Sequence, residues 1–321
     1  MNEVRTKNGH NLFEISSLIQ KALRRGDKEF AAYAANEMER DFRPYLWKRL
    51  FVVSAEDCFD MVSHQILQLK ELDDKEKNNE YISYAVALLT ETRKNRDADF
   101  FACNLLYSRY KKDYPCGGEI QTRHGHDAKK LADILTQKLL QGDDVEVGYL
   151  ANEIRQWYRG LFLVCANIAA SQLSFSDVEE EVNALEQIDI LNMKTKNNTT
   201  IYICKAITTI FKAAKYGNGI FQTITPQPLN IEDYGAFRKI PRYCYDVHTW
   251  QGKRMGKTDD DFIVEEQQSL HPHQQGEYDD RDWTNSRKWR TEGRHHDFNT
   301  PKLPKKVLAD VNKGKFQPTL F

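Results

Sequence analysis

The stretch LFEISSLIQKALRRGDKEFAAYAANEM, from Leu12 to Met38, decides the fold class. Its first half places apolar residues at helical spacing, and Asn11 precedes it as an N-cap whose side-chain oxygen can accept from free N–H groups. Gly26 ends this helix because a residue in that position favours positive φ, and Asp27 caps the helix that follows. The stretch therefore predicts a helical hairpin.

The same order of caps and glycines recurs further along the chain. The matched pairs are TKNGHN from Thr6 with TRHGHD from Thr122, Gly26-Asp27 with Gly142-Asp143, and YAANEM from Tyr33 with YLANEI from Tyr149. At a smaller offset, Arg93–Cys103 resembles Lys194–Cys204. Any two amphipathic helices look somewhat alike, but amphipathicity constrains only the apolar positions. Matching glycines and caps therefore indicate a duplicated helical domain.

The character of the chain changes after the second copy. Proline, glycine and aromatic residues become frequent and helical periodicity fades, which predicts irregular structure. A basic, proline-punctuated end follows. We expect an all-α protein with two tandem helical-bundle repeats at 1–116 and 117–216, an irregular or mixed C-terminal region at 217–298 and a flexible tail at 299–321.

Composition excludes several classes of protein. Among the 321 residues, 40% are hydrophobic and 29% charged, with a formal net charge of −1, so any nucleic-acid contact must come from a local patch. The first residues lack the apolar core of a signal peptide, and no apolar run approaches a membrane span. The cysteines lie far apart and form no Cys-x-x-Cys pair. We expect a cytoplasmic protein without a membrane partner.

The run from Leu12 to Phe59 resembles the C-terminal helical domain of the MgsA/RarA/WHIP-type AAA+ ATPases, which are similar to clamp loaders. Ser54-Ala55-Glu56-Asp57 resembles the family's Ala-Ser-Glu-Asp segment, and Lys196-Asn197-Asn198 resembles its Pro-Lys-Ser-Asn turn. The resemblance covers roughly residues 10 to 275. Weaker matches are Tyr202, Lys94-Asn95, Asp246, His248, Glu266-Gln267, Leu270 and Pro272.

What the resemblance implies is an oligomerisation module, with a second copy of the chain or an AAA+ protein as partner. Within these 321 residues nothing resembles the ATPase half of that family. Gly252-Lys-Arg-Met-Gly256-Lys257-Thr258 has three residues between its glycines where a P-loop needs four, and no apolar strand precedes it. We expect no cofactor and no ATPase activity.

The sequence Gln317-Pro318-Thr319-Leu320-Phe321 resembles the motif that docks on bacterial sliding clamps. A glutamine amide both donates and accepts, which can fix the register of a bound peptide. Leu320 and Phe321 can bury apolar and aromatic area in a pocket. Pro318 restricts the free peptide, so less entropy is lost on docking. We expect Gln317, Leu320 and Phe321 to bind a clamp, the alternative being an arbitrary tail.

A basic stretch with two tryptophans, from Arg281 to Arg294, is a candidate for nucleic-acid binding. Arginine and lysine side chains can meet phosphates while tryptophan rings stack on bases. The alternative is a solvated arm whose tryptophans pack on the body. The candidate residues are Trp283, Arg287, Lys288, Trp289, Arg290 and Arg294.

Histidines offer weaker candidates for metal binding or catalysis. Asp246 and His248 could form an acid/base pair, although a structural hydrogen bond between them is the commoner arrangement. Helix capping explains the first histidine cluster, and the second lies in a charged region, so we expect no catalytic residue and no metal site. The two clusters are His124, His126 and Asp127, and His271, His273, His295, His296 and Asp297.

Together these patterns predict a non-enzymatic replication or repair accessory factor, of phage or other mobile-element type, that docks on the bacterial sliding clamp. Its helical body would bind a partner or DNA. Two alternatives stay open: a metal-dependent nuclease that uses the histidine-rich C-terminal third, and an oligomeric assembly scaffold.

Overall fold

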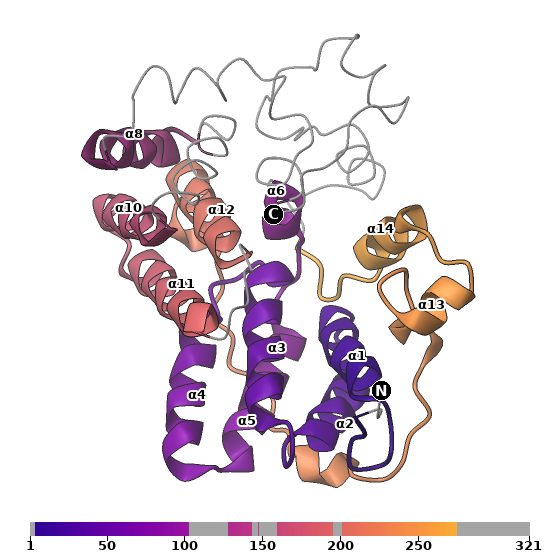
Figure 1. Cartoon of the computed structure of the whole chain (residues 1–321). Helices are drawn as coiled ribbons and strands as arrows, with labels where there is room; N and C mark the ends of the chain where they lie inside the picture. The colour runs from indigo at the N-terminus through magenta and orange to yellow at the C-terminus, as the bar shows by residue number, and fades with distance from the viewer. Residues whose placement is uncertain (1–3, 103–127, 143–146, 148–158, 195–200, 275–321) are drawn as a thin grey trace. The chain divides into compact units, whose positions relative to one another are not determined.

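The computed structural model describes residues 4–102, 128–142, 147, 159–194 and 201–274 (Figure 1). Within these ranges the chain forms α-helices, short 3-10 helices and isolated β-bridges, without a β-strand. The expected all-α class is confirmed. The chain divides into two compact units, the first with described residues 4–96 and 222–274, the second with those from 97 to 221. The expected boundary at 116/117 falls outside the described residues.

The first unit is built on five helices. They are α1 (Leu12–Arg24), α2 (Lys28–Met38), α3 (Arg43–Glu56), α4 (Ser63–Glu76) and α5 (Asn79–Glu91). α1 packs on α2 and α3, and α5 contacts all four of the others (Figure 1). The buried centre of α3 includes Leu46, Leu50 and Val53, all without exposed area, as its apolar sequence predicts.

The predicted caps of the first hairpin are confirmed. The Asn11 side chain accepts from the Phe13 N–H at 2.8 Å, and the Asp27 side chain accepts from the Phe30 N–H at 3.2 Å. Gly26 has φ of +65°, the conformation predicted for it. Two pairs of alanines, Ala31–Ala32 and Ala34–Ala35, flank Tyr33 in α2 and are fully buried, which lets α1 and α2 approach closely.

Residues 222–274 pack around the α1–α2 hairpin. They contain η4 (Ile231–Tyr234), η5 (Arg242–Cys244), α13 (Trp250–Arg254) and α14 (Asp259–Gln268). η4 packs on α2 and η5 on α1. The irregular character expected up to Trp250 is confirmed, whereas α14 had not been predicted. Its cap explains it: Thr258 and Asp261 form a capping box at the start of the helix.

The second unit contains α6 (Asp97–Phe101), α8 (Ala128–Gln141), α10 (Arg159–Gln172), α11 (Ser176–Lys194), α12 (Ile201–Tyr216) and η3 (Asn218–Ile220). In Figure 1, α10 lies between α8 and α11, and it packs on both. α12 packs on α6, α8, α10 and α11, and is the most buried helix of this unit.

The bounds of one pair of helices match between the two units. α3 and α10 both have 14 residues, and their first and last residues lie 116 positions apart. Gly142 ends α8 with φ of +69°, 116 positions after Gly26. The pairings match as well: α1, α3, α4 and α5 contact one another as α8, α10, α11 and α12 do, apart from the α1–α4 and α8–α11 pairs. The tandem repeat is confirmed for these helices.

These pairings favour a different match for the later part of the repeat. α12 occupies the place of α5, so the residues that lead into α12 correspond to those that lead into α5. The sequence KTKNN from Lys194 thus corresponds to KEKNN from Lys75, and not to the stretch from Arg93. The expected match of Arg93–Cys103 with Lys194–Cys204 joins similar residues that do not occupy equivalent places in the two copies.

Candidate functional site

The largest group of ionisable side chains in the first unit surrounds Arg24, the last residue of α1. Its guanidinium binds Asp57 through two contacts, Nε to Oδ1 at 2.8 Å and Nη2 to Oδ2 at 3.1 Å. Arg96 donates to the same Asp57 Oδ1 at 2.8 Å, and Glu56 accepts from both arginines. Glu266 of α14 pairs with Arg24. We call these five residues the arginine–carboxylate cluster.

The cluster is largely closed to solvent. The side chains of Arg24, Asp57, Arg96 and Glu266 are at most 3% exposed, and that of Glu56 is 19% exposed. Its three carboxylates face Arg24, Arg96 and also Arg25, whose guanidinium lies 3.9 Å from Glu266. Buried pairs of this kind are costly to break, because removing one partner leaves an uncompensated charge. The cluster therefore joins α1, the end of α3 and α14 structurally.

Two further buried ion pairs lie where residues 222–274 meet the rest of the first unit. Lys21 contacts Asp246 at 2.6 Å and donates to the Cys244 carbonyl at 2.7 Å. Arg93 binds Asp60 through Nε at 3.0 Å, and Asp60 also accepts from the Gln222 N–H at 2.9 Å. The ionic contacts of this unit thus hold the two segments of chain together.

Asp246 and His248, the expected acid/base alternative, lie close together. The Asp246 carboxylate accepts from the His248 N–H at 2.9 Å, and the His248 ring nitrogen Nδ1 lies 3.6 Å from it. Burial alone would raise the pKa of Asp246, but the hydrogen bonds from His248 and Lys21 hold it well below its usual range. A general base needs a pKa near the working pH. The arrangement favours the structural hydrogen bond.

The P-loop-like string forms helix ends. A Cβ on Gly252 would lie 1.9 Å from the Asp246 carbonyl oxygen, so this position has no room for a side chain. Gly256 has φ of +76° in the turn after α13, and Lys257 pairs with Glu265. Thr258 caps α14. Each matched residue therefore has a packing or capping role, and residues 222–251 contain no strand that could aim a phosphate loop.

A cavity of about 390 Å³ lies beside the ends of α1 and α14. Burial, followed by the nearby charge of Arg24, lowers the pKa of Arg25 to about 10, and its guanidinium lies 4.7 Å from the centre of the Tyr243 ring. Arg25 also donates to the Lys21 carbonyl at the end of α1. Helix carbonyls favour cations, so these basic residues are partly neutralised. The lining residues are Arg25, Arg242, Tyr243, Met255, Lys257, Glu265, Gln268 and Ser269.

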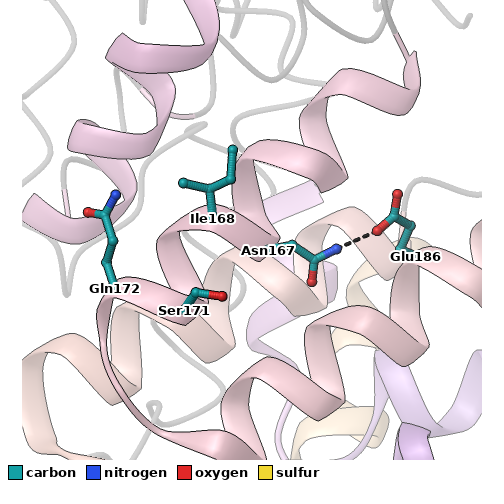
Figure 2. Close-up of a pocket in the computed structure, with 5 residues that line it drawn as sticks. All are labelled: Asn167, Ile168, Ser171, Gln172 and Glu186. Carbon is teal, nitrogen blue, oxygen red and sulfur yellow. Dashed lines mark hydrogen bonds between the residues drawn. The ribbon is translucent and has the colours of Figure 1, made fainter.

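A cavity of about 440 Å³ lies in the second unit between α10 and α11 (Figure 2). Asn167 of α10 donates to Glu186 of α11. Burial raises the pKa of Glu186, and this hydrogen bond offsets only part of the rise. Figure 2 shows Ile168 beside this pair, and Ile168 is 47% exposed. The other lining residues are Ser171 and Gln172. The wall is mainly apolar and holds one ionisable group, which suits contact with an apolar side chain better than chemistry.

The residues predicted to carry function lie outside the described ranges. This applies to the clamp-docking residues Gln317, Leu320 and Phe321, and to the basic stretch with Trp283, Arg287, Lys288, Trp289, Arg290 and Arg294. It also applies to His124, His126, Asp127, His295, His296 and Asp297. Those predictions stay predictions. Within the described ranges, no three histidine, cysteine, aspartate or glutamate residues gather in a way that could hold a metal ion.

No protein-family model matches the chain, and neither a curated protein nor a solved structure matches it. Among the described residues, no helix has both the length and the apolar character needed to cross a membrane.

Proposed function

We propose that this protein is a non-enzymatic accessory factor of DNA replication or repair that docks on the bacterial sliding clamp through Gln317-Pro318-Thr319-Leu320-Phe321. The observation that carries the proposal is the amino-acid sequence of this peptide. It combines a glutamine that can fix register with an apolar and an aromatic anchor, and a proline that lowers the entropy cost of docking. Such a factor acts in the bacterial cytoplasm.

The helical body supports an accessory role. It resembles the helical domain of clamp-loader-like ATPases, and several of its buried ionisable groups in the first unit are paired with one another. We propose that this body contributes a contact to DNA or to another protein, while the peptide holds the protein at the clamp. An assembly of several copies is compatible with this role, and light scattering would show it as a defined oligomer.

The test is binding of the full-length protein to a bacterial sliding clamp, measured by isothermal titration calorimetry. A variant with Leu320→Ala and Phe321→Ala should lose binding, because it lacks both anchors of the peptide. Thr319→Ala is the matched control, since it changes the spacer and keeps glutamine and anchors. Equal affinity of the wild type and the double variant, or no affinity of the wild type, would refute clamp docking.

The nuclease alternative needs a separate experiment. Incubation of the purified protein with DNA and Mg²⁺ or Mn²⁺ should leave the DNA intact if the protein is non-enzymatic. Cleavage that disappears in His248→Ala or His296→Ala would replace the proposal with a metal-dependent nuclease.

A further inference from the structure

Three aromatic side chains of the first unit are largely exposed to solvent. Phe13 is 70%, Trp250 69% and Phe237 66% exposed, which makes them the most exposed large hydrophobic residues of the described chain. Isolated apolar residues are common on protein surfaces, but a group of them indicates a binding site. The three aromatic residues therefore indicate a binding site only if they lie close together on the surface.

Side-chain contacts bring the segments that carry Phe237 and Trp250 to the first turn of α1, which carries Phe13. Phe13 belongs to that turn. The Phe237 ring stacks on His10, just before it, with centroids 5.0 Å apart and planes at 16°. The Gln251 side chain, next to Trp250, donates to the Glu14 carboxylate, next to Phe13, at 2.7 Å. We call Phe13, Phe237 and Trp250 the aromatic surface.

Packing of the buried core does not account for Phe13 or Trp250. Phe13 lies off the buried stripe of α1, which includes Ile15, Leu18 and Ile19. Phenylalanine is a poorer helix former than alanine, and at 70% exposure its ring gains little from burial. Trp250 begins a helix of five residues and is equally exposed. These rings are therefore available for a ligand.

Basic side chains accompany the rings. The Arg254 guanidinium lies 4.6 Å from the centre of the Trp250 ring. Lys253 and Lys239 are exposed and lie close in sequence to Trp250 and Phe237. Lys7, in the turn before α1, donates to the neutral Asn36 amide at 3.1 Å, which leaves its charge uncompensated by that contact. Of the nearby carboxylates, Glu14 accepts from the neutral Gln251 amide, and Glu29 pairs with Arg238.

We propose that the aromatic surface and its basic neighbours bind single-stranded nucleic acid. Rings stack on bases whatever the base is, and cations track the phosphate backbone. A surface that binds another protein would instead have an apolar centre with few charged residues, since charged residues are depleted at the centre of protein–protein interfaces. The proposal deepens the DNA contact of the proposed function, but it does not depend on clamp docking.

The test measures fluorescence anisotropy of a labelled oligothymidylate of about 16 nucleotides, the upper site size for one single-strand-binding module. The full-length protein should bind at low salt, and a variant with Phe13→Ala and Trp250→Ala should bind about tenfold or more weakly. Trp250→Phe should retain most of the affinity, because phenylalanine still stacks. A variant with Lys253→Ala and Arg254→Ala should lower the slope of log affinity against log salt by about 1.

Matched controls come from the same unit. Tyr84 on α5 is 44% exposed, and Lys75 on α4 is exposed, so Tyr84→Ala and Lys75→Ala remove an aromatic ring and a charge elsewhere. Both should leave the affinity unchanged. A DNA duplex of the same length should bind more weakly, because its bases are already stacked and out of reach of the rings.

Failure of this proposal can be told apart from failure of clamp docking. Deletion of Gln317–Phe321 should leave oligonucleotide binding intact, and the Phe13→Ala, Trp250→Ala variant should still bind the clamp. The proposal is overturned if the oligonucleotide does not bind. It is also overturned if binding depends wholly on Trp283 and Trp289 and is unaffected by Phe13→Ala and Trp250→Ala.

Discussion

The helices α3 and α10 occupy the same place in the two units, but only the first is covered. Phe51, Val52 and Ala55 of α3 are at most 7% exposed. The residues 116 positions later are Asn167, Ile168 and Ser171 of α10, which line an open cavity. Glu56 binds two arginines, whereas its counterpart Gln172 lines the cavity. One helical framework therefore carries a closed face and an open one.

The difference follows from the partners of each face. Arg24 and Asp57, which bind each other in the first unit, have Leu140 and Leu173 at the corresponding positions of the second. Residues 222–274 bring Glu266 and Asp246 to the first unit, where they meet Arg24 and Lys21. The two copies thus share the bounds of α3 and α10 and the glycine turns, while the charge pairing of the first unit involves a segment from later in the chain.

The largest effect should come from breaking the arginine–carboxylate cluster. Asp57→Ala removes the acceptor shared by Arg24 and Arg96, and leaves two buried guanidinium groups short of a partner. Loss of one partner of a buried pair costs about 3–5 kcal/mol of unfolding free energy. Urea unfolding would measure this, and hydrogen exchange should rise most in α1 and α14. A loss below about 1 kcal/mol would contradict the role given to the cluster.

The next effect concerns Lys94, which is fully buried. Burial lowers the pKa of its ammonium group to about 8. Between this pKa and the ordinary value of about 10.4, the unfolded chain binds more protons than the folded one, so raising the pH stabilises the fold. Over this window the gain is at most about 3 kcal/mol, and below pH 8 the contribution of Lys94 does not change with pH.

The measurement compares the pH dependence of unfolding free energy for the wild type and Lys94→Met. The wild type should gain stability relative to the variant as the pH rises above 8. Parallel curves for the two proteins would show that Lys94 has an ordinary pKa in the folded state.

The two matched glycines allow a direct comparison of the units. Gly26 and Gly142 both have positive φ, so alanine at either position should cost about 1–2 kcal/mol. A Cβ at Gly26 would also lie 2.9 Å from His271 Cδ2 and 3.1 Å from its carbonyl oxygen, whereas at Gly142 it meets nothing within 4 Å. Gly26→Ala should therefore destabilise the protein more than Gly142→Ala. Equal midpoints of thermal unfolding would indicate that His271 moves aside freely.

The smallest effect should come from Ile168 on the open face of α10, which can be compared with Val52 on the covered face of α3. Val52→Ala removes buried methyl groups and should cost about 2 kcal/mol. Ile168→Ala removes more carbon atoms, but from a side chain that is 47% exposed, and should cost about 1 kcal/mol or less. Differential scanning calorimetry of the two variants checks the order. A larger loss for Ile168→Ala would mean that the α10 face is covered in solution.

Local sequence signals were sufficient for much of the fold. The caps Asn11 and Asp27, the glycine turns and the apolar centre of α3 are local features, and the structure has them where they were predicted. The partners of Arg24 and Lys21 could not be predicted, because Glu266 and Asp246 lie more than two hundred positions away in the chain. Phe13 could have been singled out, since it is a large apolar residue in the first turn of α1 that lies off the apolar stripe of that helix.

The first unit is assembled from two stretches of chain, and the described residues of the second unit lie between them. During synthesis, its early helices must therefore wait roughly 6 to 25 s, the time a ribosome needs for residues 97 to 221, before the segment that covers them exists. Through that interval Lys21 and Arg24 have no Asp246 or Glu266 to meet. The described helices of the second unit, which all lie between residues 97 and 221, can be finished first. We therefore expect the N-terminal helices of the nascent protein to reach their final packing last, although they are synthesised first.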